Sequence, residues 1–338
     1  MTTPQSAADG TQGKKGPDVK RRSMLAAGVA LGAGAVAGPA PAWAAAETGL
    51  SAGDIEAARR LFAAGAYTRL DEVLPLLLAA AHSTEQTPAS AARAAAVWVL
   101  ASQLAVKQGH TAPASTYAER AAAAARRSGD PVVLAAAARA AATPLRRTGR
   151  THEALLLLNE ARTHLLASAR PTAAELEAAG LAALTAAYTA AQAHQPATAR
   201  DFAAQAEENT LRLARHPHTA SRPRELTASQ CTLYGIGIHR HLGDVDTALA
   251  HARQLRPAHL PTAERRARAA TDTARALLDA SDTVGAFAQL RLVELAAPLE
   301  ARRPSVRALT AHVAELRPDL PGLSDYVHRT LASPLRPA

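Results

Sequence analysis

Histidine, acidic and cysteine side chains are the usual carriers of catalytic and metal chemistry, and this sequence has 13 His, 29 Asp and Glu, and one Cys. It contains no His-Glu-x-x-His zinc motif, no second cysteine and no complete phosphate-binding loop. His239 and His241 are two positions apart near the end of a predicted helix, so they do not share a helical face that would bind a metal ion. We therefore expect no catalytic residues, no metal site, no cofactor and no enzymatic activity.

Polar side chains that come before predicted turns, most of them basic, are the better candidates for a binding site. They are Arg59, Gln103, Lys107, Arg146, Arg147, Arg240, His241 and Arg275. We expect them to line a basic groove, and a guanidinium group binds a carboxylate through two parallel hydrogen bonds. The groove predicts a protein or peptide partner, and an acidic peptide or a small anion would match its charge. The alternative is that each residue is a solvated side chain, or a cation stabilised by a helix C-terminus.

The composition restricts the elements that can position these residues. With 48% hydrophobic and 20% charged residues, the chain is too apolar for a disordered protein. Alanine, the best helix former, is abundant, and aromatic residues make up only 3%, which favours helices over strands. The formal net charge is +9, but residues 1–44 hold five basic and two acidic side chains, and the remaining excess is too small to indicate nucleic-acid binding.

A turn residue followed five positions later by a small or apolar residue recurs along the chain and predicts helical hairpins. The turn residues are Gly65, Gly109, Gly149, His194, Gly243 and Ser281. Glycine after a helix adopts a left-handed conformation at little steric cost, and the chain then returns as a second helix. Each hairpin has an apolar face that stacking must cover. We predict an all-α fold, a right-handed α-solenoid of about six helical hairpins over residues 47–300 with C-terminal capping helices and a tail over residues 301–338. The first helices would line its concave surface.

The hairpin pattern resembles the tetratricopeptide repeat in its glycine turn, the alanine five positions later and the apolar residues four and seven positions beyond that. Residues 98–104, 143–150 and 234–244 also resemble the tetratricopeptide-like region of actinobacterial helix-turn-helix transcriptional regulators. The first resemblance implies a non-enzymatic protein or peptide interaction module. The second implies the alternative of a cytoplasmic regulatory or effector-sensing protein. Only 19 residues precede Lys20, so we expect no DNA-binding domain and no direct DNA binding.

Residues 1–46 have the features of an export signal. After a polar stretch that we expect to be disordered, Arg21 and Arg22 precede an apolar run, and Ala42 and Ala44 flank a tryptophan in an Ala-x-Ala cleavage pattern. This order is typical of a signal peptide, and the arginine pair is similar to the twin-arginine signal. The apolar run is shorter than the about 20 residues that span a bilayer, so we expect no stable membrane span. We predict export through the twin-arginine pathway; the alternative is a basic linker in a cytoplasmic protein.

Overall fold

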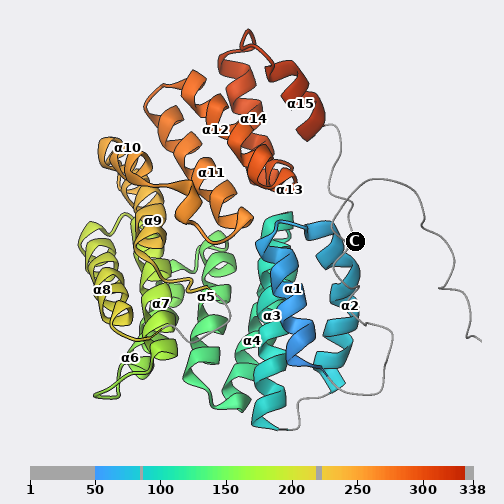
Figure 1. The fold of residues 1–338 in the computed structure, drawn as a ribbon, viewed down its shortest axis with the longest axis vertical. Helices are drawn as coiled ribbons and strands as arrows, with labels where there is room; N and C mark the ends of the chain where they lie inside the picture. Colours follow the sequence, from blue (N-terminus) through green and yellow to red (C-terminus); the bar gives the residue numbers. More distant parts are fainter. Residues whose placement is uncertain (1–49, 84–86, 218–222, 332–338) are drawn as a thin grey trace, which may run out of the picture. The chain divides into compact units, whose positions relative to one another are not determined.

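The computed structural model describes residues 50–83, 87–217 and 223–331, and every regular element in these residues is a helix (Figure 1). Most of the helices follow one another in pairs. The first helices of the pairs are α1 (Ala52–Ala63), α3 (Pro88–Gln108), α5 (Pro131–Arg147), α7 (Ala173–Gln192), α9 (Ala228–His241) and α11 (Ala263–Asp279). The second helices are α2 (Tyr67–Ser83), α4 (Thr111–Ser128), α6 (Thr151–Leu165), α8 (Pro196–Ala214), α10 (Val245–Gln254) and α12 (Thr283–Ala296). The predicted all-α fold class is confirmed.

All six predicted turn residues connect the two helices of a pair through a left-handed backbone. The glycines at 65, 109, 149 and 243 have φ between 71° and 86°. His194 and Ser281 take the same role with φ of 54° and 63°, a region that side chains other than glycine rarely adopt. The positive φ lets the chain reverse immediately after the first helix. The positions of the hairpin turns are thus confirmed.

Local sequence signals also fix where several helices begin. Thr172 Oγ1 accepts the Glu175 amide at 3.2 Å, and Glu175 Oε2 accepts the Thr172 amide at 2.7 Å, which completes a capping box before α7. Asp130 Oδ1 accepts the Val132 amide at 2.8 Å at the start of α5. These side chains satisfy amides that have no partner inside the helix.

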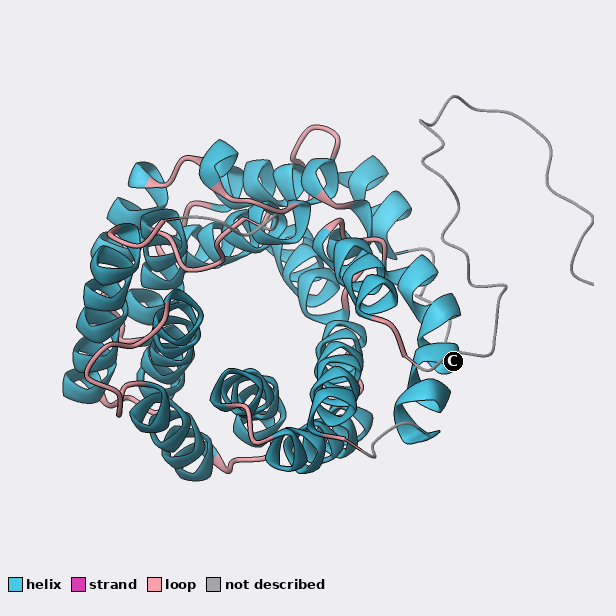
Figure 2. Ribbon diagram, turned by 60° about the horizontal axis from the view of Figure 1, so that its bottom comes forward, coloured by secondary structure: helices cyan, strands magenta, loops and turns pink. Residues whose placement is uncertain are grey.

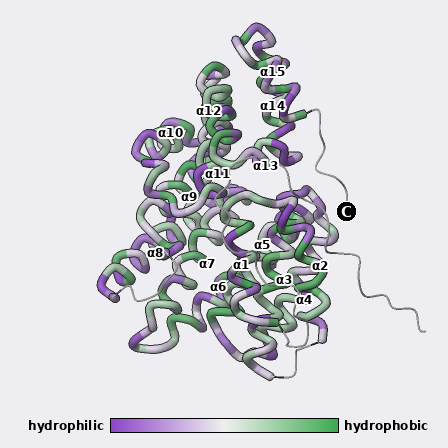
Figure 3. The backbone as a smooth tube through the Cα atoms, turned by 45° about the vertical axis from the view of Figure 1, so that its right-hand side comes forward, coloured by the Kyte–Doolittle hydropathy of each residue, from purple (hydrophilic) through white to green (hydrophobic). Residues whose placement is uncertain are grey.

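The first helices form a continuous layer. Each first helix contacts the second helix of its own pair. The first helices α1, α3, α5, α7, α9 and α11 also contact one another in sequence order. Figure 2 shows the helices packed side by side in a view turned by 60°. Most helices carry both hydrophobic and hydrophilic residues (Figure 3), since one face packs on neighbouring helices while the other is exposed. Side chains on α5, α7, α9 and α11 can therefore meet across this layer.

The C-terminal part consists of α13 (Pro298–Ala301), α14 (Pro304–Leu316) and α15 (Leu323–Leu331), and a short 3-10 turn, η1 (Pro257–His259), precedes α11. The sequence predicts helices within residues 301–338, where α14 and α15 lie, and α13 is an addition. Tyr326 of α15 donates a hydrogen bond to the Leu290 carbonyl of α12 at 2.9 Å, and its ring packs edge-on against Phe287. These contacts cover the apolar face of the last pair.

Helices from the two ends of the described chain also contact each other. A methyl group on Gly65 would lie 2.8 Å from Cβ of Ala297, and one on Gly109 would lie 3.1 Å from the Pro304 ring. Leu299 packs against the hydrophobic core of α1 to α3. The first two turns thus require glycine for close packing as well as for positive φ.

Two sequence predictions concern membranes and export. Among the described residues, α3 is the one helix long and apolar enough to cross a membrane, and most of its apolar stretch is buried against other helices, as in the core of a soluble protein. The predicted signal residues Arg21, Arg22, Ala42 and Ala44 lie outside the described residues.

Candidate functional site

The layer of first helices brings cationic and aromatic side chains together on a partly exposed surface. We call this the arginine–tyrosine surface. Its residues are Arg139 and Arg146 of α5, Tyr188 of α7, Tyr234 and His241 of α9, and Arg268, Asp272 and Arg275 of α11.

On α5, the guanidinium of Arg146 is held by neutral groups. Its Nη1 donates to Thr189 Oγ1 at 2.8 Å, and its Nη2 donates to Thr143 Oγ1 at 2.9 Å. Its Cζ lies 5.3 Å from the centre of the Tyr188 ring. Burial lowers the pKa of Arg146, and the nearby positive charge of Arg268 adds to that effect. The hydroxyl groups orient this cation but do not neutralise it.

On α11, two arginines share one carboxylate. Arg275 Nη1 is 2.9 Å from Asp272 Oδ1, and Arg268 Nε is 3.5 Å from Asp272 Oδ2. The Arg268 guanidinium also lies 4.3 Å from the centre of the Tyr234 ring, close enough for a cation–π contact. Asp272 is buried, whereas the side chains of Arg268 and Arg275 are 23% and 26% exposed. The carboxylate thus lies deeper in the protein than the two arginine side chains that share it.

Nearby arginines lower the pKa of Tyr234 and of His241, whereas burial raises the pKa of Tyr188. Burial raises the pKa of Tyr234, but Arg268, Arg265 and Arg139 outweigh this effect and bring the pKa down to about 7. Burial and the adjacent arginines lower the pKa of His241 to about 4, so its imidazole is neutral at pH 7. Four guanidinium groups outnumber one carboxylate and a Tyr234 phenol that is about half ionised at pH 7, so this surface favours an anion.

Tyr188 of α7 packs against α9 at the centre of this surface. Its hydroxyl is 3.1 Å from His241 Nε2, and its ring packs edge-on against both His241 and Tyr234. A methyl group on Gly237 would lie 2.6 Å from Cε2 of the same ring. Glycine at 237 thus leaves the space that the tyrosine ring occupies.

The structure brings three of the eight predicted binding residues, Arg146, His241 and Arg275, onto this surface. Arg240 has its Nε 2.7 Å from Asp279 Oδ2. Arg59 has an exposed contact of 3.8 Å with Glu56, and Gln103 is half-buried on α3. The remaining two, Lys107 and Arg147, lie in different environments.

Lys107 is buried in an ion cluster between α3 and the C-terminal helices. Its Nζ contacts Glu264 Oε1 and lies 2.6 Å from Glu300 Oε1. Glu300 Oε2 also accepts from Arg303 Nη1 at 2.6 Å, and the Tyr67 hydroxyl donates to Glu300 Oε1. Burial raises the pKa of both glutamates, but Lys107 and the nearby arginines outweigh it and hold the pKa values below the usual range. The ammonium group of Lys107 is thus matched by two carboxylates inside the protein.

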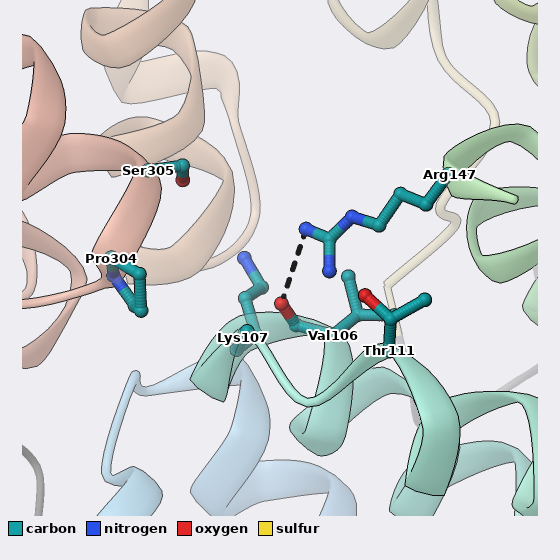
Figure 4. Close-up of a pocket in the computed structure, with 7 residues that line it drawn as sticks. Val106, Lys107, Thr111, Arg147, Pro304 and Ser305 are labelled. Atoms are coloured by element: carbon teal, nitrogen blue, oxygen red, sulfur yellow. Dashed lines mark hydrogen bonds between the residues drawn. The ribbon is translucent and has the colours of Figure 1, made fainter.

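Arg147 points away from the arginine–tyrosine surface, although it is adjacent to Arg146 in sequence. It extends from the end of α5 toward α3 and donates from Nη2 to the Val106 carbonyl at 3.4 Å (Figure 4). It lines a cavity of about 260 Å³.

Sequence reasoning missed five residues of the surface, although the register of the hairpins contains a signal for them. They are Arg139, Tyr188, Tyr234, Arg268 and Asp272. The residues of the surface fall two (His241), three (Arg146), six (Tyr188 and Arg275), nine (Tyr234 and Asp272), ten (Arg139) and thirteen (Arg268) positions before their turn residues. Steps of three and four residues keep side chains on one face of a helix. Steps of three or four residues toward the N-terminus from each turn would therefore have identified the missed residues.

Ser51 stands in the sequence Gly-Leu-Ser-Ala-Gly at residues 49–53, which has the spacing of a hydrolase nucleophile elbow. That motif requires a strand, a sharp turn and a helix. Here Ser51 precedes α1, and its Oγ accepts the Asp54 amide at 3.1 Å, so it serves as a helix cap. Within the described residues, no group of three or more His, Cys, Asp or Glu side chains is placed to hold a metal ion.

No family model matches the chain, and no curated protein matches it significantly. The resemblance to tetratricopeptide repeats and to the regulators remains a prediction.

Proposed function

We propose that this chain is a non-enzymatic α-solenoid of the tetratricopeptide type that binds an anionic segment of a protein partner on the arginine–tyrosine surface. The solenoid proposal is supported by six helix pairs whose first helices contact one another in sequence order. Stacked hairpins of this kind present their first helices as one extended binding face.

The observation that carries the binding proposal is the charge balance of the surface. Arg146 has neutral hydroxyl partners, and Arg268 and Arg275 share Asp272. Guanidinium groups match the geometry of carboxylates. A segment rich in Asp and Glu would therefore find both charge and hydrogen-bond partners.

The direct test is a titration of a fluorescent oligo-glutamate peptide, followed by anisotropy at low ionic strength. We expect saturable binding that weakens with added salt, and no binding of an oligo-lysine peptide. Each hydrogen bond to a charged group contributes about 1.5–3 kcal/mol, so Arg268→Gln should weaken binding about ten-fold or more. Arg253→Gln on the exposed face of α10 is the control and should leave the affinity within two-fold. Equal affinities for the two variants would refute the assignment.

Export is a separate proposal and is tested by itself. Residues 1–46 fused to a reporter protein should direct its secretion, and replacement of Arg21 and Arg22 by lysine should stop it. A reporter that stays inside the cell would favour the cytoplasmic alternative.

A further inference from the structure

The cavity that Arg147 lines lies apart from the arginine–tyrosine surface, where three parts of the chain meet. These are the α3–α4 turn, the end of α5 and the start of α14 (Figure 4). Its lining residues are Val106, Lys107, Gly109, Thr111, Arg147, Pro304 and Ser305. Its volume of about 260 Å³ is below the roughly 300–1,000 Å³ of pockets that enclose a drug-sized ligand, so it suits a small group.

The charge that faces the cavity is positive. The hydrogen bond of Arg147 goes to a carbonyl oxygen and is long, at 3.4 Å. Burial lowers the pKa of Arg147, and the nearby cation Arg303 lowers it further. Lys107 and Arg303 are matched by Glu264 and Glu300, so the charge of Arg147 is the one that an anion in the cavity would balance.

Hydroxyl groups complete a set of donors around the same space. Thr111 and Ser305 line the cavity and stand in the first turns of α4 and α14. Neither helix has a side-chain hydrogen bond at its N-cap. Pro113 and Pro304 carry no amide hydrogen, so the amides of Thr111, Ala112 and Ser305 are the ones that add donors to the charge and hydroxyls already present.

We propose that this cavity binds one tetrahedral oxyanion of the size of inorganic phosphate, with Arg147 as its charged ligand and Thr111 and Ser305 as hydroxyl donors. Donors from α4, α5 and α14 approach the space from different elements, which suits a tetrahedral anion better than a planar carboxylate. Because these helices belong to distant parts of the sequence, the bound anion would also join them.

The test is a calorimetric titration of the full chain with inorganic phosphate at low ionic strength. We expect saturable binding at one site for the unchanged protein and at least a ten-fold loss for Arg147→Gln. Arg126→Gln, near the end of α4, is the matched control and should bind within two-fold of the unchanged protein. Circular dichroism checks that both variants are folded. The inference is overturned if phosphate does not bind, or if Arg147→Gln binds it as the control does.

Two further arms separate this cavity from the proposed peptide site and identify the source of the anion. Arg268→Gln should leave phosphate binding unchanged. If Arg268→Gln loses phosphate binding while Arg147→Gln binds phosphate normally, the anion lies on the arginine–tyrosine surface and the inference is overturned. Ser305→Asp would place a carboxylate beside Arg147 and should abolish phosphate binding while keeping the fold.

Competition experiments identify the source of the anion. A phosphoserine peptide that competes more strongly than phosphate would identify a modified protein as the source, and weaker competition would identify the free ion. Acetate that binds as tightly as phosphate would refute the tetrahedral assignment.

Discussion

Replacement of Lys107 by methionine tests the buried ion cluster most directly. Methionine keeps the unbranched shape of the lysine stem but removes the ammonium group that lies between Glu264 and Glu300. Lys107 is only 8% exposed, and the two glutamates are 5% and 0% exposed. The substitution thus leaves carboxylates where water has little access.

The cost of Lys107→Met can be bounded from the remaining contacts. Removal of one partner from a buried ion pair costs about 3–5 kcal/mol, because the other charge is left uncompensated. Arg303 still donates to Glu300 at 2.6 Å, and Arg265 still lies 3.5 Å from Glu264. We therefore expect the lower end of that range, about 3 kcal/mol.

Urea denaturation followed by circular dichroism measures this loss. The control is Arg150→Met, which removes an ion pair with Glu153 whose side chains are more than half exposed, and which should cost about 0–1 kcal/mol. Adding Glu264→Gln to Lys107→Met should recover part of the stability, because one stranded charge is then removed. A loss below about 1 kcal/mol for Lys107→Met would refute the view that this cluster stabilises the fold.

Three further predictions concern single residues. The phenol of Tyr234 should ionise at about pH 7, against about 10 in the unfolded chain, so the folding free energy should become more favourable as pH rises between these values. Ultraviolet difference absorbance measures this ionisation, and Arg268→Met should raise its midpoint; an unchanged midpoint would exclude Arg268 as the cause. Gly237→Ala should displace the Tyr188 ring that packs on Gly237 and so weaken peptide binding. Gly235→Ala, whose methyl group would meet His251 instead, should leave peptide binding unchanged. Burial raises the pKa of Cys231, so its thiol should react with disulfide reagents more slowly in the folded protein than in urea; equal rates would contradict its burial.

The sequence predicts the hairpins well because their signals are local. The turn at Gly149 needs a residue that tolerates positive φ, and alanine-rich segments on both sides favour helices. His194 and Ser281 were found by spacing rather than by residue type, and their positive φ shows that the register of the pairs was right.

The partners across the layer could not be predicted in the same way. Lys107 and Glu264 are 157 positions apart, and no local pattern indicates that they meet. The adjacent Arg146 and Arg147 point to different places, because successive residues on a helix differ in direction by about 100°. Sequence reasoning therefore identified both arginines but did not show that Arg146 lies on the arginine–tyrosine surface while Arg147 lines the cavity.

The contact of Lys107 with Glu264 and Glu300 has a consequence for folding cooperativity. Arrays of repeats in which each unit touches only its neighbours can unfold from their ends one unit at a time. Here α3 is joined to α11 and α13, so loss of the C-terminal helices would expose charged groups beneath the first pairs. Closing so long a segment costs only slightly more entropy than closing a shorter one. Amide protons in α3 and α11 should therefore exchange through the same opening event, and the two ends of the helical array should melt as one unit.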